Sequence, residues 1–481
     1  MRYTIIPALL MAGSLVPAAA LAQAEDADRA YITGWDELAS ASHVSDGMER
    51  SRDGSPIFTG PMGAQAVSYN GYQYVVYYTG RDRTVDREEA SSRVVVARRQ
   101  LGAFGWQRAT LQNYEVTSDD AHNRQTIGIS EGDGVIHISF DHHNRPQMNY
   151  AATAVGVATN PSSVEWDDNV FTYAENLGGD ASERLNVTYP DFTPFPGGNL
   201  LVYFRSGGST GGEMRVARYD SETGSWGQVR NISSRRGTFE GEETTRGPYL
   251  AEGMQVGGDG SLHAAWLFRE RPCDFTTSSR SEIFCNHGLF YARSEDEGRT
   301  WLRADGTVIA DTEAGEVMSI DNLGGPVFDV PKGLGPSNPS ITSTIDTASD
   351  EMHVLLRHLP GPGANGTAYF HYLGQPDGTW TQNRTDFDGN NASLTVVGDR
   401  LYAFVGRDRG QIYYAERSDN FRRWRRLDIE VGERGKFDPS GGFITWDLSM
   451  LESGRATMLW HRDPESNGVS SPLQVFDISF E

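Results

Sequence analysis

Histidines at both ends of one predicted hairpin are the residues best suited to chemistry. The stretch from His122 to His143 reads HNRQTIGISEGDGVIHISFDHH, in which two alternating runs flank an acidic, glycine-containing turn. A β-hairpin carries its two ends to the same edge of a sheet. We therefore expect His122 and Asn123 to lie beside His142 or His143, and the adjacent pair leaves open which of the two takes part. Clustered imidazoles suit proton transfer or metal binding near neutral pH.

Tyrosine and arginine occupy comparable places in the next two stretches of sequence. Tyr189 precedes a predicted strand and Arg205 ends the strand that follows, while Arg246 and Tyr249 stand just before a further strand. If neighbouring strand ends meet on one face, these groups form one pocket with the histidines. Taken singly, each tyrosine is equally well explained as a packing residue.

These residue types suit β-elimination from a uronic acid sugar. A base must remove the C5 proton beside the carboxylate, and an acid must protonate the departing O4 substituent. Arg205 can stabilise the negative charge that builds on the carboxylate. His122 and Tyr189 are both candidates for the acid and the base, with His142 beside them, and Asn123, His143, Arg246 and Tyr249 are expected to bind substrate. No cofactor is needed for this step.

The two cysteines of the chain lie in one stretch together with two histidines. His263, Cys273, Cys285 and His287 match the ligand set of one closed structural zinc site. A disulfide between Cys273 and Cys285 is the alternative, and it would be natural in an exported protein. His263 also shares its place in the repeat with His137 and His353, which favours a structural role for it.

Short β-rich blocks recur along the chain and predict the fold. Similar turn-and-strand starts occur at Gly132, Gly197, Gly258, Ser349 and Gly398, and a second strand, a turn and a tryptophan often follow. The run SEDEGRTW from Ser294 to Trp301 fits an Asp box, in which the aspartate holds a turn and the tryptophan packs between sheets. We expect an all-β, seven-bladed β-propeller, whose last blade joins the C-terminal strands to the N-terminal region.

Composition limits the location and the partners. Residues 1–24 read as a signal peptide, with Arg2 followed by an apolar run that ends in small residues, so residues 25–481 are expected to form a single catalytic propeller domain. The protein is expected to be secreted or periplasmic, monomeric and free of the membrane after cleavage. A net charge of −23 argues against a nucleic-acid partner. Because nearly all basic residues are arginines, bidentate contacts to carboxylate or sulfate are available.

The motifs taken together resemble the propeller-fold ulvan lyases of polysaccharide lyase family 25. The resemblance covers essentially the whole mature chain and rests on the BNR-type repeats and on the order His122, His142, Tyr189, Arg205, Tyr249. It implies cleavage of ulvan, an anionic sulfated rhamnose–uronate polysaccharide of algae, with an unsaturated uronyl end as product. It also implies an acid–base role for Tyr189 or His122, neutralisation of the carboxylate by Arg205, and zinc at the Cys/His set.

Two other functions fit the repeats. A sialidase-like glycoside hydrolase also uses Asp boxes on a propeller, but it needs a placed carboxylate pair or a Tyr–Glu nucleophile, and no such set stands out here. A non-catalytic glycan-binding propeller needs aromatic residues for stacking but no acid–base set.

Overall fold

The computed structural model describes most of the chain between residues 29 and 481. The described residues are 29–39, 64–79, 92–116, 123–208, 211–244, 246–250, 253–270, 286–335, 341–362, 364, 366–387, 389–432, 435–461 and 472–481. The predicted signal peptide, His122, Cys273 and Cys285 lie outside them. In the described part of the chain, no helix is long and apolar enough to cross a membrane.

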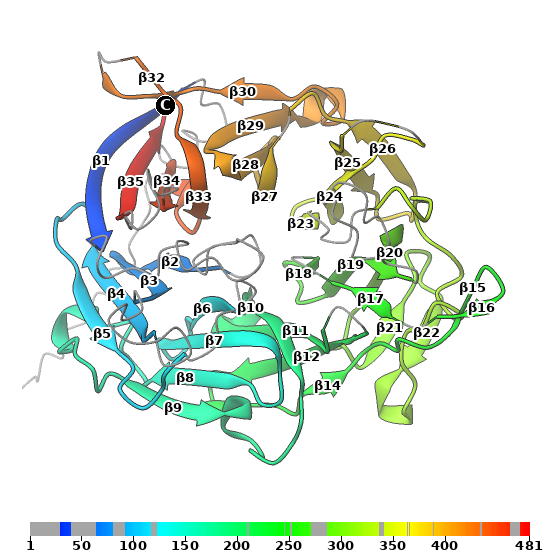
Figure 1. Ribbon diagram of the computed structural model, residues 1–481, viewed down its shortest axis with the longest axis horizontal. Coiled ribbons are helices and arrows are strands. Elements are labelled where there is room, and N and C mark those ends of the chain that lie inside the picture. Colours follow the sequence, from blue (N-terminus) through cyan, green and yellow to red (C-terminus); the bar gives the residue numbers. More distant parts are fainter. Residues whose placement is uncertain are drawn as a thin grey trace, which may run out of the picture.

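The fold is an all-β propeller, as expected. Antiparallel sheets are arranged radially around a central axis, and each sheet follows the previous one around the ring in sequence order (Figure 1). Helical geometry in the described residues is confined to short 3-10 turns such as Pro161–Ser163 and Leu451–Ser453. We call each radial sheet a blade and name it by its strands.

The blades in the first half of the chain are four-stranded or nearly so. Blade β2–β5 contains β2 (Ala66–Tyr69), β3 (Tyr72–Tyr78), β4 (Val94–Gln100) and β5 (Gln107–Thr110). Blade β6–β9 contains β6 (Arg124–Ser130), β7 (Val135–Arg145), β8 (Asn149–Thr153) and β9 (Phe171–Glu175). Blade β10–β14 contains β10 (Val187–Phe195), β11 (Asn199–Ser206), β12 (Glu213–Asp220), β13 (Ser225–Trp226) and β14 (Arg230–Asn231).

The blades in the second half carry small additions. A short hairpin of β15 (Thr238–Phe239) and β16 (Glu242–Glu243) precedes the next blade. That blade, β17–β22, contains β17 (Gly247–Tyr249), β18 (Met254–Val256), β19 (Leu262–Arg269), β20 (Asn286–Ser294), β21 (Thr300–Leu302) and β22 (Val308–Asp311). Blade β23–β26 contains β23 (Ile341–Asp346), β24 (Glu351–His358), β25 (Ala368–Gly374) and β26 (Trp380–Arg384). Blade β27–β30 contains β27 (Asn390–Val397), β28 (Arg400–Arg409), β29 (Gln411–Glu416) and β30 (Arg425–Leu427).

The N-terminal strand completes the last blade of the chain. β33 (Ser440–Asp447), β34 (Arg455–His461) and β35 (Leu473–Phe480) pair in order, and β1 (Ala30–Ala39) pairs antiparallel with β35. β31 (Ile429–Glu430) adds to β1 in parallel and pairs with β32 (Lys436–Phe437). The predicted closure by the N-terminal region is therefore confirmed, and it ties the two ends of the ring together.

Apolar side chains fill the spaces between neighbouring blades. Tyr74 and Val76 of β3 pack in one buried cluster with Ile127 of β6 and with Ile136 and Ile138 of β7. Because each blade is covered on both faces, its middle strands bury residues that point to either side. The near-continuous apolar runs in the sequence are thus explained, because they form strands that lie between two neighbouring blades of the propeller.

The predicted Asp box has the expected geometry. Asp296 Oδ1 accepts hydrogen bonds from the Thr300 backbone N–H at 2.7 Å and from Ser294 Oγ at 2.8 Å. Trp301 is fully buried, and its Nε1 donates to the Gly298 carbonyl at 3.1 Å. The motif therefore fixes the turn between β20 and β21.

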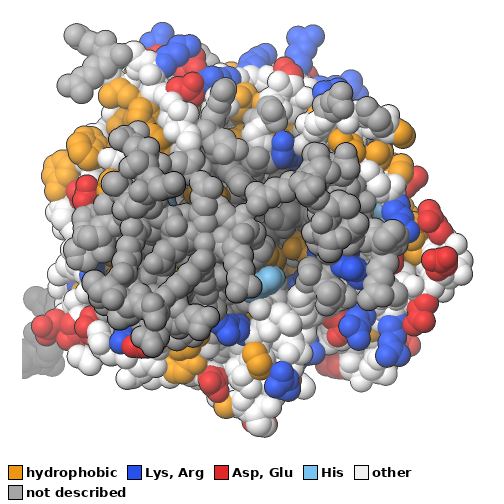
Figure 2. Space-filling view, in the orientation of Figure 1, with side chains coloured by type: hydrophobic (Ala, Val, Ile, Leu, Met, Phe, Trp, Pro, Cys, Tyr) orange, Lys and Arg blue, Asp and Glu red, His pale blue; other side chains and the backbone are white. Residues whose placement is uncertain are grey.

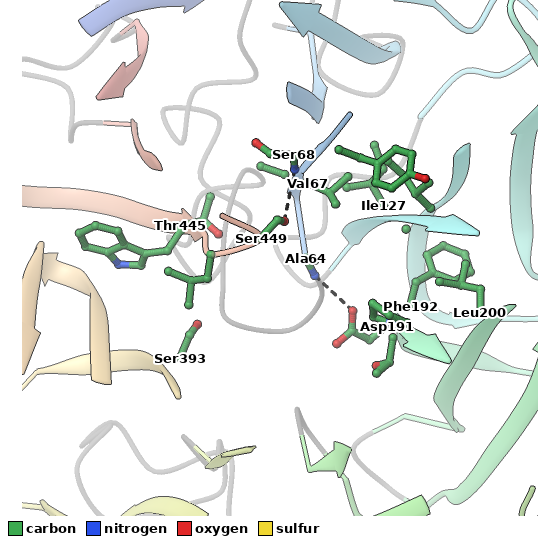
Figure 3. A pocket seen from close by; sticks show the side chains of 18 of the residues that line it. Ala64, Val67, Ser68, Ile127, Asp191, Phe192, Leu200, Ser393, Thr445 and Ser449 are labelled. Atoms are coloured by element: carbon green, nitrogen blue, oxygen red, sulfur yellow. Dashed lines mark hydrogen bonds between the residues drawn. The ribbon is translucent and has the colours of Figure 1, made fainter. Parts of the chain in front are cut away.

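The inner strands surround an axial cavity of about 540 Å³. Its wall includes Val67, Ile127, Asp191, Ser393 and Thr445, which come from different blades (Figure 3). Asp191 accepts a hydrogen bond from the Ala64 backbone N–H at 3.2 Å and another from Tyr203 Oη at 2.9 Å. Burial raises the pKa of Asp191. None of the predicted site residues lines this cavity, so we look for the site where the strands end.

Candidate active site

The register of neighbouring strands gathers the candidate side chains. The end of β7 pairs with the start of β10, which places His143 opposite Thr188, and Thr188 in turn lies opposite Arg205 on β11. This pairing joins blade β6–β9 to blade β10–β14 in one continuous sheet. In the next blade, Arg269 at the end of β19 pairs with Gly247. The predicted convergence of strand ends is thus confirmed for His143, Tyr189, Arg205 and Tyr249.

Unusual backbone conformations shape this junction. Asp141, Asn144 and Tyr189 have φ values of 58°, 59° and 52°. Aspartate and asparagine tolerate this region, whereas a bulky residue followed by proline is strained in it by about 1–3 kcal/mol. Tyr189 lies at the irregularity between Thr188 and Asp191, where β10 bends away from its register with β11. The bend aims the Tyr189 side chain toward the end of β7.

The rings of His143 and Tyr189 lie side by side at this junction. Their centroids are 6.1 Å apart and their planes differ by 19°. His143 is partly exposed and Tyr189 is almost buried. The Asn144 backbone N–H donates to Thr188 Oγ1 at 2.7 Å, which fixes the strand that carries one ring against the strand that carries the other. Two groups able to transfer protons therefore share one rim.

His142 is buried beneath this rim and does not belong to it. Its Nε2 lies 3.2 Å from the carbonyl oxygen of Asn149 and 3.0 Å from Ser139 Oγ. Burial lowers the pKa of His142 to about 3, so the ring is neutral at physiological pH. The sequence left open which of the two histidines takes part, and the structure places His143, not His142, beside Tyr189, while a catalytic role for either stays a prediction. Side chains alternate along β7, and the neighbour that reaches Tyr189 is His143.

Arg205 is a buried cation held by backbone carbonyls. Its Nη1 donates to Gly207 O at 2.8 Å and also to Gly208 O, while Nε donates to Pro248 O at 3.3 Å. Gly212 makes room for it, since a Cβ there would lie 2.5 Å from Arg205 Cζ. Burial lowers the pKa of Arg205 to about 10, which still leaves it positive at neutral pH. With its donors so engaged, Arg205 offers its surroundings mainly its positive charge.

Two guanidinium groups lie against the ring of Tyr249. Arg205 Cζ is 5.0 Å from the centroid of the Tyr249 ring, and Arg269 Cζ is 4.0 Å from it. Arg269 is also buried, and its Nε donates to Asn286 Oδ1 at 3.0 Å. Burial lowers the pKa of Arg269. Both arginines interact electrostatically with Tyr189 as well, so the two tyrosines share two cations.

The other predicted substrate-binding residues lie around this group. Arg246 is nearly buried, and its carbonyl oxygen accepts a 3.0 Å hydrogen bond from the Gly212 backbone N–H. It adds a third positive charge close to Arg205. Asn123 is buried immediately before β6. His122 lies outside the described residues, so its part in the site stays a prediction.

Local positive charge contrasts with the acidity of the whole chain. Arg205, Arg246 and Arg269 meet at strand ends in a protein whose net charge is −23. Elsewhere, acidic and basic side chains are interspersed around the rim of the molecule (Figure 2). Three arginines at one place favour an anionic ligand, because their charges act together over a few ångströms.

The predicted zinc ligands are not all brought together. His263 stands near the start of β19, whereas His287 pairs with Phe268 near the end of that strand. Five residues along a strand span about 17 Å. His263 Nε2 is bonded to Ser261 Oγ at 2.8 Å and Nδ1 to Tyr291 Oη at 2.7 Å. The inclusion of His263 in the metal site is therefore wrong, and Cys273 and Cys285 fall outside the described residues.

Arg269 is a member of this arginine cluster that the sequence analysis missed. It ends the block GDGSLHAAWLFR just as Arg205 ends the block GGNLLVYFR. Comparing the last position of successive second strands could have found it. A buried neighbour, Glu270, follows at once, and its Oε1 lies 3.7 Å from His287 Nε2.

Comparisons with known proteins match the chain to a repeat-containing family and find it similar to polysaccharide lyases. A family model described as "BNR repeat-containing family member" matches residues 72–387. An ulvan lyase, long isoform, from Alteromonas sp is 23% identical over 466 residues, covering 86% of this chain and 42% of the relative. The chain thus spans less than half the length of the curated relative that it matches.

Two solved structures share the fold over nearly the whole chain. A crystal structure of polysaccharide lyase Uly1 aligns with a TM-score of 0.66 at 16% identity, covering 94% of this chain and 99% of that one. The structure of a polysaccharide lyase family 25 ulvan lyase bound to a GlcA(1-4)Rha3S repeat aligns with a TM-score of 0.60 at 9% identity, covering 92% and 94%. At these identities the likeness establishes a common fold.

Proposed function

Because the chain belongs to the BNR repeat-containing family and carries acid–base groups beside clustered arginines, we propose that it is a polysaccharide lyase that cleaves ulvan at its uronate residues. The observation that carries the proposal is the parallel pair of His143 and Tyr189 next to Arg205 and Arg269. Similarity to ulvan lyases over most of the chain supports the choice of substrate.

The reaction needs one proton removed and one proton supplied. The C5–H bond breaks, its electron pair forms the C4=C5 double bond, and the C4–O4 bond breaks as the leaving oxygen takes a proton. In our proposal Tyr189 and His143 carry these protons, since their rings lie side by side at the rim, where His143 is partly exposed. A proton transfer by a positioned side chain contributes about 10²–10⁴-fold to the rate.

The arginines lower the barrier by stabilising negative charge. As C5 loses its proton, charge builds on the uronate carboxylate, and Arg205, Arg246 and Arg269 are already in place around it. Preorganised cations in a site shielded from water act more strongly than they do in bulk solvent. Arg205 and Arg269 also interact electrostatically with Tyr189.

A direct assay separates this function from a glycoside hydrolase and from a glycan-binding propeller. The protein is incubated with ulvan while the ultraviolet absorbance of the conjugated double bond and the reducing ends are both followed. A lyase raises both, a hydrolase raises reducing ends alone, and a binding module raises neither. We expect both to rise, and reducing ends without the chromophore would overturn the proposal.

We further propose that the ring contains seven blades. The support is the succession of seven strand groups around the axis, two pairs of which are joined where β7 pairs with β10 and β28 with β33. The groups are β2–β5, β6–β9, β10–β14, β17–β22, β23–β26, β27–β30 and β33–β35 with β1. A crystal structure of the mature chain tests the count directly. A further blade, or the merging of two of these sheets into one blade, would contradict it.

We also propose that a structural zinc ion uses His287 and the two cysteines without His263. His287 Nε2 and Glu270 Oε1 are both buried without a hydrogen-bond partner among the described residues, so a donor set is available at the end of β19. Elemental analysis tests this. His287→Ala is expected to lose the zinc and His263→Ala to keep it, whereas absence of zinc together with a Cys273–Cys285 disulfide would refute the proposal.

We propose finally that residues 1–24 direct the protein out of the cytoplasm and are then removed. Their composition is the support. N-terminal sequencing of the protein recovered outside the cytoplasm should begin near residue 25. An intact N-terminus in the cytoplasmic fraction would contradict export.

A further inference from the structure

A smaller pocket of about 180 Å³ lies at the opposite end of β19 from Arg269. Its wall comes from two neighbouring blades: His263 and Tyr291 belong to blade β17–β22, and Trp380 belongs to blade β23–β26. The volume has room for about six water molecules. This is the size of one small ring-shaped molecule and is too small for several linked rings. None of the candidate active-site residues lines it.

The repeat provides a closed counterpart to this pocket. His137 of blade β6–β9 is bonded as His263 is, with Nε2 3.0 Å from Ser130 Oγ and Nδ1 2.7 Å from Tyr150 Oη. Aromatic rings of the following blade pack against His137. The Tyr219 ring lies 4.5 Å from the imidazole, and the Trp226 ring lies 5.6 Å from it.

A glycine opens the pocket beside His263. Tyr219 pairs with Trp226 across β12 and β13, and Gly374 pairs with Trp380 across β25 and β26 in the same way. Gly374 therefore stands where the covering tyrosine stands in the closed copy. A Cβ at Gly374 would lie 2.5 Å from the Trp380 ring, so the tryptophan rests directly over this position. The pocket beside His263 thus results from glycine at the position where the other blade has tyrosine.

The lining combines aromatic rings with carboxylates. Trp380 and Tyr291 lie 5.3 Å apart at an angle of 61° and form the apolar part. Asp259 and Asp350 line the same pocket, and hydrogen bonds from Ser261 lower the pKa of Asp259, which keeps it ionised. Trp380 Nε1 is buried and has no hydrogen-bond partner among the described residues.

The charges of the pocket select against anions. Two carboxylates, Asp259 and Asp350, outweigh the single guanidinium of Arg293, which is itself paired with Glu295. Burial lowers the pKa of His263 to about 4, so it adds no positive charge at neutral pH. Carboxylates accept hydrogen bonds from hydroxyl groups, and an aromatic ring packs against the C–H face of a sugar.

We propose that this pocket is a second saccharide-binding site that takes one neutral pyranosyl unit. Its chemistry is opposite to that of the candidate active site, where three arginines gather. The proposal stands whether or not the chain is a lyase, because none of its evidence involves the active-site residues.

Saturation-transfer NMR on the full chain tests the proposal with methyl rhamnopyranoside and methyl xylopyranoside as neutral probes and glucuronate as the anionic one. We expect saturation of the neutral probes and little of glucuronate. Trp380→Ala should weaken binding by about tenfold or more, since a stacked aromatic face is lost. Trp35→Ala, which removes an exposed tryptophan on β1, should leave binding unchanged.

A second variant covers the case in which Trp380→Ala fails to fold. Asp350 has a φ of 56°, a conformation that asparagine tolerates, so Asp350→Asn removes one acceptor charge with little strain. We expect a several-fold loss of affinity with unchanged thermal unfolding. Tyr189→Phe should bind the neutral probes as the wild type does, which separates this site from catalysis. Absence of binding, equal binding by Asp350→Asn, or a preference for glucuronate would overturn the proposal.

Discussion

The imidazole of His143 and the phenol of Tyr189 lie nearly parallel, with ring centroids 6.1 Å apart. They come from different blades, and the pairing of β7 with β10 places them at one rim. Because Tyr189 holds a φ of 52°, the contact depends on a conformation that a tyrosine adopts only at a cost. Strain of this kind is often found where a side chain must be aimed.

The two adjacent histidines should respond differently to substitution. His143→Gln should reduce turnover of ulvan by about 10²–10⁴-fold, because a proton carrier is removed, and leave thermal unfolding unchanged. His142→Gln should instead destabilise the fold by about 1–3 kcal/mol, since buried hydrogen bonds to Asn149 and Ser139 are disturbed. Kinetics and denaturant unfolding of both variants check this, and the reverse pattern would show that His142 is the working residue.

Replacing Arg269 tests the cation that only the structure revealed. Arg269→Gln removes a charge 4.0 Å from the Tyr249 ring and should lower kcat/KM by about tenfold or more. The matched control is Arg299→Gln in the same blade, whose side chain is 49% exposed. If both variants behave alike, Arg269 has no special role in the reaction.

On acidification, the free energy of unfolding should begin to decrease at a higher pH than protonation of carboxylates alone would cause. Burial lowers the pKa of His137, His142 and His353 to about 3 and that of His263 to about 4. The unfolded chain binds these protons near pH 6.5, whereas the folded protein does not. The stabilisation is therefore complete above pH 6.5 and is lost as the pH falls from there toward 3, at up to about 1.4 kcal/mol per pH unit for each histidine.

Calorimetry between pH 7.5 and 5 measures this effect. The aspartates with lowered pKa values, such as the half-buried Asp296, titrate below this window. Burial raises the pKa of Asp191, which therefore gains stability as the pH falls, but the several buried histidines outweigh this one carboxyl. We expect the melting temperature to fall steadily below pH 6.5, and a constant melting temperature down to pH 5 would contradict the assignment.

The Asp box should stabilise the fold without affecting catalysis. Asp296→Ala removes the bonds to Thr300 and Ser294 and should cost about 1–2 kcal/mol with kcat unchanged. Asp305→Ala, which removes a bond to the Thr307 backbone N–H in an exposed turn, should cost less. Denaturant unfolding of the two variants provides the comparison, and an equal cost would mean that burial of the motif is irrelevant.

Much of the fold was predictable because each blade repeats the same local pattern. Turn residues followed by alternating or apolar runs indicated the strands, and the Asp box at Ser294–Trp301 marked one turn correctly. Closure by β1 was also predictable, since the last strands of the chain needed a partner. These features depend on local sequence, which the repeat makes easy to compare.

The site was harder to predict because it depends on register between blades. The backbone bends at Asp141, and a register shift of one residue there decides whether His142 or His143 faces Tyr189. No local sequence pattern predicts this register. The error at His263 has a simpler cause. His263 and His287 both lie near the start of a strand, and the starts of two antiparallel strands lie at opposite ends of the hairpin.

The most direct test of the proposed function compares wild type and Tyr189→Phe on ulvan by following the absorbance of the unsaturated uronyl product. Tyr31→Phe, a change at a partly exposed tyrosine on β1, serves as the control. We expect wild type and control to generate the chromophore at equal rates and Tyr189→Phe to be slower by about 10²-fold or more, with unchanged circular dichroism and thermal unfolding. Equal rates in all three proteins, or no chromophore in any of them, would contradict the account.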